Sequence, residues 1–225
     1  MSIPLGTLQQ DSASGLQYRI RQGAVPKPAR CLVLLHGVGS NEANMLALAD
    51  GVSDATLVVT VRGPLELGPG QFAWFRVAFT ANGPRIEPEE AEHSRLALIA
   101  LVQQLQAVHG IAADKTVVAG FSQGGIMSAS VALSAPHAVA GFGLLCGRIL
   151  PELQPHVASK EQLSKLQAFV AHGELDTKLP VDWAHKSHAL LDELGVPHTL
   201  RLYPVDHGIS AQMHADFLYW LASLP

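Results

Sequence analysis

Short apolar runs of strand length recur along most of this chain and alternate with stretches of helical periodicity. The runs are rich in β-branched residues, as expected of strands that are buried on both faces of a sheet. They cover residues 31–35, 56–61, 116–119, 139–146, 166–171 and 199–203. A further segment, 16–22, alternates apolar and polar residues and is typical of an edge strand with one face in solvent.

Helical patterns lie between and after these strands. The longest predicted helix, 88–109, has an apolar stripe formed by Leu98, Leu101, Val102, Leu105 and Val108. Shorter helices are predicted around 45–49, up to residue 135, over 180–194 and over 209–221. Buried strands joined by helices imply a parallel sheet, so we expect a doubly wound α/β sandwich. Functional sites in such sheets gather at the carboxyl ends of the strands.

Composition narrows the class of protein. The 225 residues are 48% hydrophobic and 15% charged, which is enough to bury one core, so we expect a single domain over 1–225 with a loose segment at 1–14. The net charge of −4 and the lack of a basic cluster argue against a nucleic-acid partner. No membrane span or signal peptide is recognisable, and Cys31 and Cys146 lie in apolar runs, so a cytoplasmic protein is expected.

The sequence G-F-S-Q-G at 120–124 carries the clearest chemical signal. It follows the strand at 116–119 and precedes a helix of small residues, as in a nucleophile elbow. In such a turn the serine hydroxyl, here that of Ser122, stands clear of the backbone at the positive end of the following helix. Glycines two residues before and after the serine permit the tight reversal.

A serine nucleophile needs a base and a group that orients the base. In this fold the order along the chain is serine, acid, histidine, and Asp176 and His207 fit that order, each just past the end of a strand. Glu174 and Asp206 remain fallback acids. Among other histidines, His172 precedes the only well-placed acid, His198 begins a strand, His214 lies within the last helix, and His36 is expected to anchor its own turn.

Acyl transfer also needs N–H donors for the oxyanion. One is expected from the backbone of Gln123, directly after Ser122, and the other from Val38 in the turn after an early strand.

Substrate contacts are expected from the irregular segment 62–82, which holds much of the aromatic content. We expect Leu65, Phe72, Trp74 and Phe75 to bind substrate. The alternatives are that these rings cover a sheet edge, or that an exposed aromatic loop from Phe72 to Phe79 forms a homodimer contact.

Metal binding is not expected. His185 and His188 lie three residues apart on a predicted helix, but no third ligand is evident nearby. No cofactor is implied.

Four blocks resemble the signature blocks of the bacterial phospholipase/carboxylesterase family, which includes acyl-protein thioesterases. They read LLHGVGSNEANM, GFSQGGIMS, HGELDTKLPV and YPVDH, and the similarity runs from Leu32 to the final helix. The resemblance implies an α/β-hydrolase fold without a large lid, a triad of Ser122, Asp176 and His207, and hydrolysis of short- to medium-chain esters or thioesters. Many relatives have an acidic residue after the aromatic pair Trp74-Phe75, where this chain has Arg76, and glycine at the position of Asp206.

The leading hypothesis is therefore a serine carboxylesterase that acts on a small-molecule ester. A thioesterase or a lysophospholipase would use the same residues, whereas a dienelactone-type hydrolase would have cysteine at position 122. A non-catalytic binding protein with this fold usually lacks part of the machinery, and here every element is present.

Overall fold

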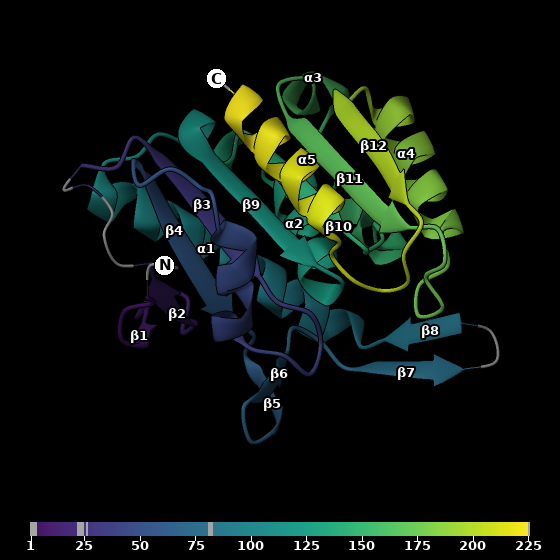
Figure 1. Cartoon of the computed structure of the whole chain (residues 1–225), viewed down its shortest axis with the longest axis horizontal. Coiled ribbons are helices and arrows are strands. Elements are labelled where there is room, and N and C mark those ends of the chain that lie inside the picture. Colours follow the sequence, from purple (N-terminus) through teal and green to yellow (C-terminus); the bar gives the residue numbers. More distant parts are fainter. Residues whose placement is uncertain (1–3, 22–24, 26, 81–82, 225) are drawn as a thin grey trace.

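One mixed sheet forms the centre of the molecule (Figure 1). A computed structural model of the chain describes residues 4–21, 25, 27–80 and 83–224. The strand order in the sheet is β1-β2-β4-β3-β9-β10-β11-β12. The pairs β1–β2 and β2–β4 are antiparallel and the remaining pairs are parallel. The strands are β1 (Gln9–Gln10), β2 (Gln17–Ile20), β3 (Arg30–Leu35), β4 (Thr56–Arg62), β9 (Thr116–Phe121), β10 (Gly141–Leu145), β11 (Gln167–Gly173) and β12 (His198–Tyr203).

Helices cover both faces of this sheet. The α-helices are α1 (Pro88–His109), α2 (Gln123–Ser134), α3 (Lys160–Leu163), α4 (Asp182–Leu194) and α5 (Ala211–Ser223). The 3-10 helices are η1 (Glu42–Ala49), η2 (Ala113–Lys115), η3 (Pro136–Ala138) and η4 (Pro151–His156). Alternate residues of β3 separate the two apolar layers: Val33 packs in the layer that includes α1, α2 and α4, and Leu34 in the layer that includes η1 and α5. Figure 1 shows α5 in front of the sheet and α1 and α2 behind it.

The irregular segment after β4 contains two hairpins. Strands β5 (Leu65–Gly68) and β6 (Gln71–Ala73) form one, and β7 (Val77–Thr80) and β8 (Gly83–Ile86) form the other. Both hairpins lie to one side of the main sheet in Figure 1. The connection from β10 to β11 holds only η4 and α3, so this connection adds no large lid, as predicted.

Four local expectations need correction. The strand near residue 18 is not the edge of the sheet, because β1 from the supposedly loose segment 1–14 pairs outside it. The helix around 45–49 is a 3-10 helix, and its Leu46 is only half-buried. Val108 is 64% exposed and so does not belong to the buried stripe of α1. Helix α5 begins after Ile209, which is 37% exposed. The end of α4 at Gly195, whose φ is 73°, agrees with the sequence.

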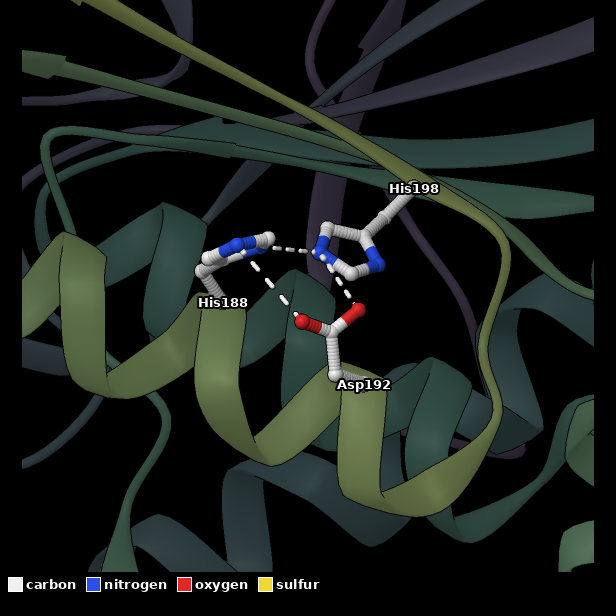
Figure 2. A group of neighbouring side chains, drawn as sticks. All are labelled: His188, Asp192 and His198. Atoms are coloured by element: carbon white, nitrogen blue, oxygen red, sulfur yellow. Dashed lines mark hydrogen bonds and ion pairs between the residues drawn. The ribbon is translucent and has the colours of Figure 1, made fainter.

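Three side chains link α4 to β12 (Figure 2). His188 and Asp192 lie one turn apart on α4, and His198 begins β12. The Nδ1 atom of His188 lies 2.6 Å from His198 Nε2. Asp192 lies 3.5 Å from His188 Nε2 and 3.9 Å from His198 Nε2.

Within the described ranges, no helix is both long enough and apolar enough to cross a membrane.

Candidate active site

Ser122, His207 and Asp176 are joined by hydrogen bonds at the carboxyl edge of the sheet. The Oγ atom of Ser122 lies 3.0 Å from His207 Nε2, and His207 Nδ1 lies 2.6 Å from Asp176 Oδ2. The second oxygen, Oδ1, accepts the backbone N–H groups of Lys178 and Leu179 at 2.9 and 2.8 Å. Because Asp176 is held in place and accepts a hydrogen bond from the Nδ1–H of His207, Nε2 is left unprotonated and can accept a hydrogen bond from the Ser122 hydroxyl.

The alternative acids have other contacts. Glu174 is exposed. Asp206 accepts the backbone N–H of Thr177 at 3.0 Å and that of His207 at 2.8 Å, both through Oδ1. The bond from Thr177, followed by that from His207, lowers the pKa of Asp206. Asp206 therefore ties two loops together and leaves the imidazole of His207 to Asp176.

The alternative histidines also have other contacts. His172 is fully buried, and its Nε2 lies 2.8 Å from the Leu179 carbonyl oxygen and 3.3 Å from Asp176 Oδ2. Burial lowers the pKa of His172, so its ring stays neutral and supports the loop that carries Asp176. His198 contacts α4, and His214 Nε2 lies 3.2 Å from the Leu48 carbonyl oxygen.

The turn around Ser122 has the strained backbone of an elbow. Ser122 has φ 54° and ψ −117°, which is rare for a residue with a side chain and costs about 1–3 kcal/mol. A Cβ atom at Gly120 would collide with the backbone of Gly124, and one at Gly124 would collide with the backbone of Leu35. Only glycine fits at these two positions, so the G-x-S-x-G spacing follows directly from the close packing of β9, α2 and β3.

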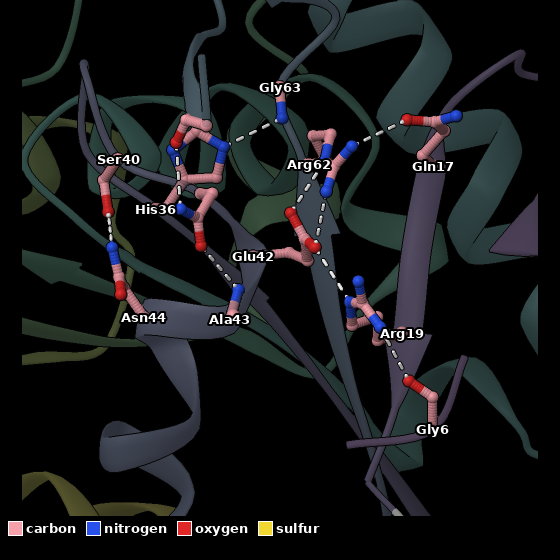
Figure 3. Close-up of polar contacts among 12 residues, drawn as sticks. Gly6, Gln17, Arg19, His36, Ser40, Glu42, Ala43, Asn44, Arg62 and Gly63 are labelled. Carbon is pink, nitrogen blue, oxygen red and sulfur yellow. Dashed lines mark hydrogen bonds and ion pairs between the residues drawn. The ribbon is translucent and has the colours of Figure 1, made fainter. Parts of the chain in front are cut away.

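The turn after β3, which carries Val38, is fixed by His36 and its neighbours (Figure 3). The imidazole of His36 accepts the Gly63 N–H at Nε2 (2.9 Å), and its Nδ1 donates to the carbonyl of the next residue (2.8 Å). The indole N–H of Trp74 donates to the His36 carbonyl at 2.9 Å. His36 is thus an anchor of its own turn, and its buried ring has a lowered pKa because of desolvation.

A buried carboxylate lies beside this turn (Figure 3). Glu42 is 1% exposed and accepts hydrogen bonds from Arg62 Nε at 2.7 Å, Arg62 Nη2 at 2.8 Å and Arg19 Nε at 2.8 Å. Burial alone would raise the pKa of Glu42, but the bonds from Arg62 and then Arg19 outweigh it and lower the pKa to about 2. The network ties η1 to β2 and β4 below the Val38 turn.

The two residues expected to supply oxyanion donors, Val38 and Gln123, line the same cavity. The backbone N–H groups of Val38 and Gln123 donate to no acceptor within the part of the chain that the structure describes. Gln123 is the first residue of α2, where an N–H has no partner in its own helix. Both residues line the cavity above Ser122.

The side chain of Gln123 holds the aromatic segment against α2. Its Oε1 accepts the backbone N–H of Trp74 and its Nε2 donates to the carbonyl of Phe75, both at 2.7 Å. Trp74 and Phe75 are buried, at 0% and 1% exposure. These two rings are therefore not exposed for a dimer contact, and the homodimer itself stays a prediction.

A cavity of about 400 Å³ lies over Ser122 and His207. Of the four predicted substrate contacts, Phe75 lines it, whereas Leu65, Phe72 and Trp74 do not. We correct the expectation for these three residues: Trp74 bonds to the His36 turn, Phe72 stacks under Arg62 at 4.4 Å, and Leu65 lies in the β5–β6 hairpin. Further lining side chains that the sequence did not single out are Val77, Ile86, Phe121, Ile126, Arg148, Lys178 and Leu179.

Comparisons with known proteins identify the family of this chain. The model of the Phospholipase/Carboxylesterase family matches residues 18–224. The chain belongs to the phospholipase/carboxylesterase family. Acyl-protein thioesterase 1 of Eremothecium gossypii is 26% identical over 216 residues, which cover 90% of this chain and 91% of the relative. Acyl-protein thioesterase 1 of Debaryomyces hansenii is 25% identical over 224 residues, with coverage of 90% and 94%.

Solved structures show the same fold. A carboxylesterase from Mesorhizobium loti superposes with a TM-score of 0.81 at 25% identity and covers 99% of this chain and 100% of its own. A carboxylesterase from Bacillus cereus superposes with a TM-score of 0.79 at 21% identity and covers 93% of this chain and 95% of its own. At this identity the likeness supports the fold alone. The protein is a serine hydrolase of the esterase and thioesterase type, with an α/β-hydrolase fold, as the sequence predicted.

One group of side chains in this family member has the ligand types of a metal site. His188, Asp192 and His198 each offer a ligand atom, and these atoms lie within 4.8 Å of one another (Figure 2). His198 Nδ1 lies 2.8 Å from the Val196 carbonyl oxygen, to which it donates, so its Nε2 is free to accept from His188. The sequence paired His188 with His185 and found no third ligand, because His198 reaches the helix only through the fold. None of the three residues lines the cavity above Ser122.

Proposed function

We propose that Ser122 is the nucleophile, His207 the general base and acid, and Asp176 the residue that orients His207. The hydrogen-bond chain from Ser122 Oγ through His207 to Asp176 supports these roles, together with the elbow geometry of Ser122. This chain is the observation that carries the proposal.

In the first half of the reaction, Ser122 Oγ attacks the carbonyl carbon while its proton moves to His207 Nε2. The negative charge that develops on the carbonyl oxygen is stabilised by the N–H groups of Gln123 and Val38. Each such donor is worth on the order of 3 kcal/mol. His207 then protonates the departing alcohol or thiol and an acyl-serine remains.

In the second half, water takes the place of the alcohol. His207 removes a proton from the water, hydroxide adds to the acyl-serine, and collapse of the second oxyanion returns Ser122 and releases the acid. The net reaction consumes one water per ester and requires no cofactor.

The acyl chain is proposed to be short to medium in length. A cavity of about 400 Å³ with an apolar wall from Phe75, Val77 and Ile86 suits such a chain. A thioester is the second candidate substrate, favoured by the names of the acyl-protein thioesterase relatives.

Hydrolysis of 4-nitrophenyl esters from C2 to C12 tests the roles, alongside matched acyl thioesters. We expect turnover by the native protein and a loss of at least about 10⁴-fold in kcat for Ser122→Ala, with the fold retained. A fluorophosphonate should label the native protein at Ser122 and leave Ser122→Ala unlabelled. Turnover that survives in Ser122→Ala would refute the assignment, and a folded native protein without turnover or labelling would favour a binding protein instead.

We also propose that the protein is cytoplasmic. Cys31 and Cys146 are buried free thiols, and burial raises the pKa of both to about 12, so both stay in the unreactive thiol form. Free thiols of this kind are typical of a reducing cytoplasm.

A homodimer is a separate proposal, and sedimentation equilibrium tests it.

A further inference from the structure

Arg148 lies in the active-site cavity without a partner for its charge. It follows β10, the strand next to β9, so it lies at the same edge of the sheet as Ser122. The residue is 5% exposed, yet it lines the cavity together with Ser122 and His207. No motif in the sequence singles out Arg148.

The other buried arginines of this protein have several polar partners each, although the Nε atom of Arg21 is buried without one. Arg21 donates to three backbone carbonyls, and Arg95 forms two hydrogen bonds with Glu92. In contrast, the guanidinium of Arg148 donates no hydrogen bond and forms no ion pair among the described residues. Its contact is with the face of Trp183, whose ring centroid lies 4.6 Å from Cζ.

No guanidinium nitrogen of Arg148 is both fully buried and unpartnered, so these nitrogens keep some contact with solvent. A nearly buried cation without a counter-charge is still poorly stabilised, and the cation–π contact offsets only part of that cost. Burial lowers the pKa of Arg148, and the charge of Glu152 counters this only in part. Arginine stays charged under all ordinary conditions, so the fold keeps a permanent, poorly hydrated cation at this place.

The positively charged residues that line the cavity, Arg148 and Lys178, follow the neighbouring strands β10 and β11. Lys178, which follows β11, lines the same cavity, and Lys186 Nζ lies 4.5 Å from the centroid of the Trp183 ring that Arg148 contacts. The segment between β4 and α1 also lines the cavity, with the apolar residues Phe75, Val77 and Ile86. Ser122 directly follows β9, which lies between β4 on one side and β10 and β11 on the other in the sheet order.

We propose that this cavity binds esters that carry a carboxylate, and that Arg148 receives the carboxylate through two parallel N–H···O hydrogen bonds. A guanidinium is suited to this planar, two-point contact, and the pairing would satisfy the charge that the fold leaves unpaired. The proposal rests on the proposed esterase function and adds its substrate class: an acidic ester, with Ser122 attacking the carbonyl while Arg148 holds the anion.

The turnover test compares esters that differ only by a carboxylate. On the acyl side the pair is mono-4-nitrophenyl adipate and 4-nitrophenyl hexanoate. On the alcohol side it is 4-hexanoyloxybenzoate and its methyl ester, with uncatalysed hydrolysis subtracted throughout. For each pair, the quantity compared is kcat/KM for the acidic ester divided by kcat/KM for the neutral ester. We expect Arg148→Met to lower this ratio about tenfold or more for at least one of the two pairs. The loss should fall mainly on KM, since the contact is made before and during the reaction.

Two further variants separate specificity from general effects. Arg148→Lys keeps the charge but not the two-point geometry, so its ratio should lie between those of native and Arg148→Met. Arg201→Met removes an exposed cation that does not line the cavity and should leave the ratio unchanged. If Arg148→Met does not fold, a fall of about threefold in the acidic-to-neutral ratio of kcat/KM for Arg148→Lys supports the proposal. An unchanged ratio in every folded Arg148 variant, for both pairs, would overturn the proposal.

A binding test needs no turnover. The anilides of adipic acid (one carboxylate free) and of hexanoic acid resist esterases, and calorimetry gives their affinities. We expect the acidic anilide to bind the native protein about tenfold more tightly than Arg148→Met, with no such difference for the neutral anilide. If the native protein hydrolyses neither ester yet shows this binding difference, the esterase function fails and the anion site stands. If the native protein hydrolyses the esters but the carboxylate has no effect in either test, the esterase function stands and the anion site fails.

Discussion

Asp176 offers its two oxygens to different groups: Oδ2 lies 2.6 Å from His207 Nδ1, while Oδ1 accepts two backbone N–H groups of its own loop. The carboxylate therefore stays in place whether or not the imidazole is charged. Since its side chain is fully buried, its negative charge acts on His207 with little screening by solvent. The relationship explains how one acid both selects the tautomer of His207 and stabilises the imidazolium.

Asp176→Asn should keep the fold and lose activity. The amide oxygen can still accept from the loop, but the charge is gone and the wrong tautomer of His207 is favoured. We expect kcat to fall by about 10³–10⁴-fold, measured with a 4-nitrophenyl ester. The matched control is Asp206→Asn, which should change kcat by less than about threefold because Asp206 contacts only backbone and Thr177. Equal losses in the two variants would mean that the acid is wrongly assigned.

Gln123→Met should weaken the site through the aromatic segment. It leaves the Trp74 N–H and the Phe75 carbonyl buried without their present partners, at about 1–3 kcal/mol each. We expect a lower free energy of unfolding and a higher KM, while the backbone N–H of residue 123 remains. The Gln123→Glu side chain can accept from the Trp74 N–H but cannot donate to the Phe75 carbonyl. Its free energy of unfolding and its KM should therefore lie between those of the native protein and of Gln123→Met. Denaturant unfolding and ester kinetics measure both effects, and native-like values for Gln123→Met would contradict the proposed tether.

Glu42 should stabilise the fold in a way that depends on pH. Its pKa falls from the ordinary 4.5 to about 2 in the folded protein. A lowered carboxyl pKa adds stability that is complete above pH 4.5 to 5 and is lost as pH falls through the folded value. The shift corresponds to about 3 kcal/mol at neutral pH, and about half of this should remain at pH 3. Unfolding of native protein and Glu42→Gln at pH 7, 5 and 4 measures the difference, which should narrow as pH falls. A difference that does not change with pH would argue against the ionised network.

His172 should lower the free energy of unfolding in mild acid. Burial lowers its pKa below the ordinary 6.5, so the unfolded chain binds a proton there more readily than the folded protein does. Stability should therefore decline as pH falls below about 6.5. His172→Gln keeps a donor toward the Leu179 carbonyl and cannot titrate. The native free energy of unfolding should fall more steeply between pH 7 and 5 than that of His172→Gln, and parallel curves would show that His172 does not contribute.

Much of the fold follows from the sequence because local patterns reflect burial. The predicted helix at 88–109 has the same limits as α1, and the six apolar runs correspond to the six strands that pair in parallel. The glycines around Ser122 are required by local geometry and so are visible as a motif. The single domain over 1–225 stays a prediction.

Strand, turn and helix signals are local, so the α/β architecture, the elbow and the order of Ser122, Asp176 and His207 can be predicted from the sequence. Which aromatic residues line the cavity above Ser122 depends on long-range packing. Trp74 and Phe72 are turned toward the Val38 turn and Arg62 by contacts between residues far apart in sequence. The same holds for Arg148: a single arginine after a strand has no local pattern, and only the packing of β10, α2 and Trp183 places its unpaired charge in the cavity.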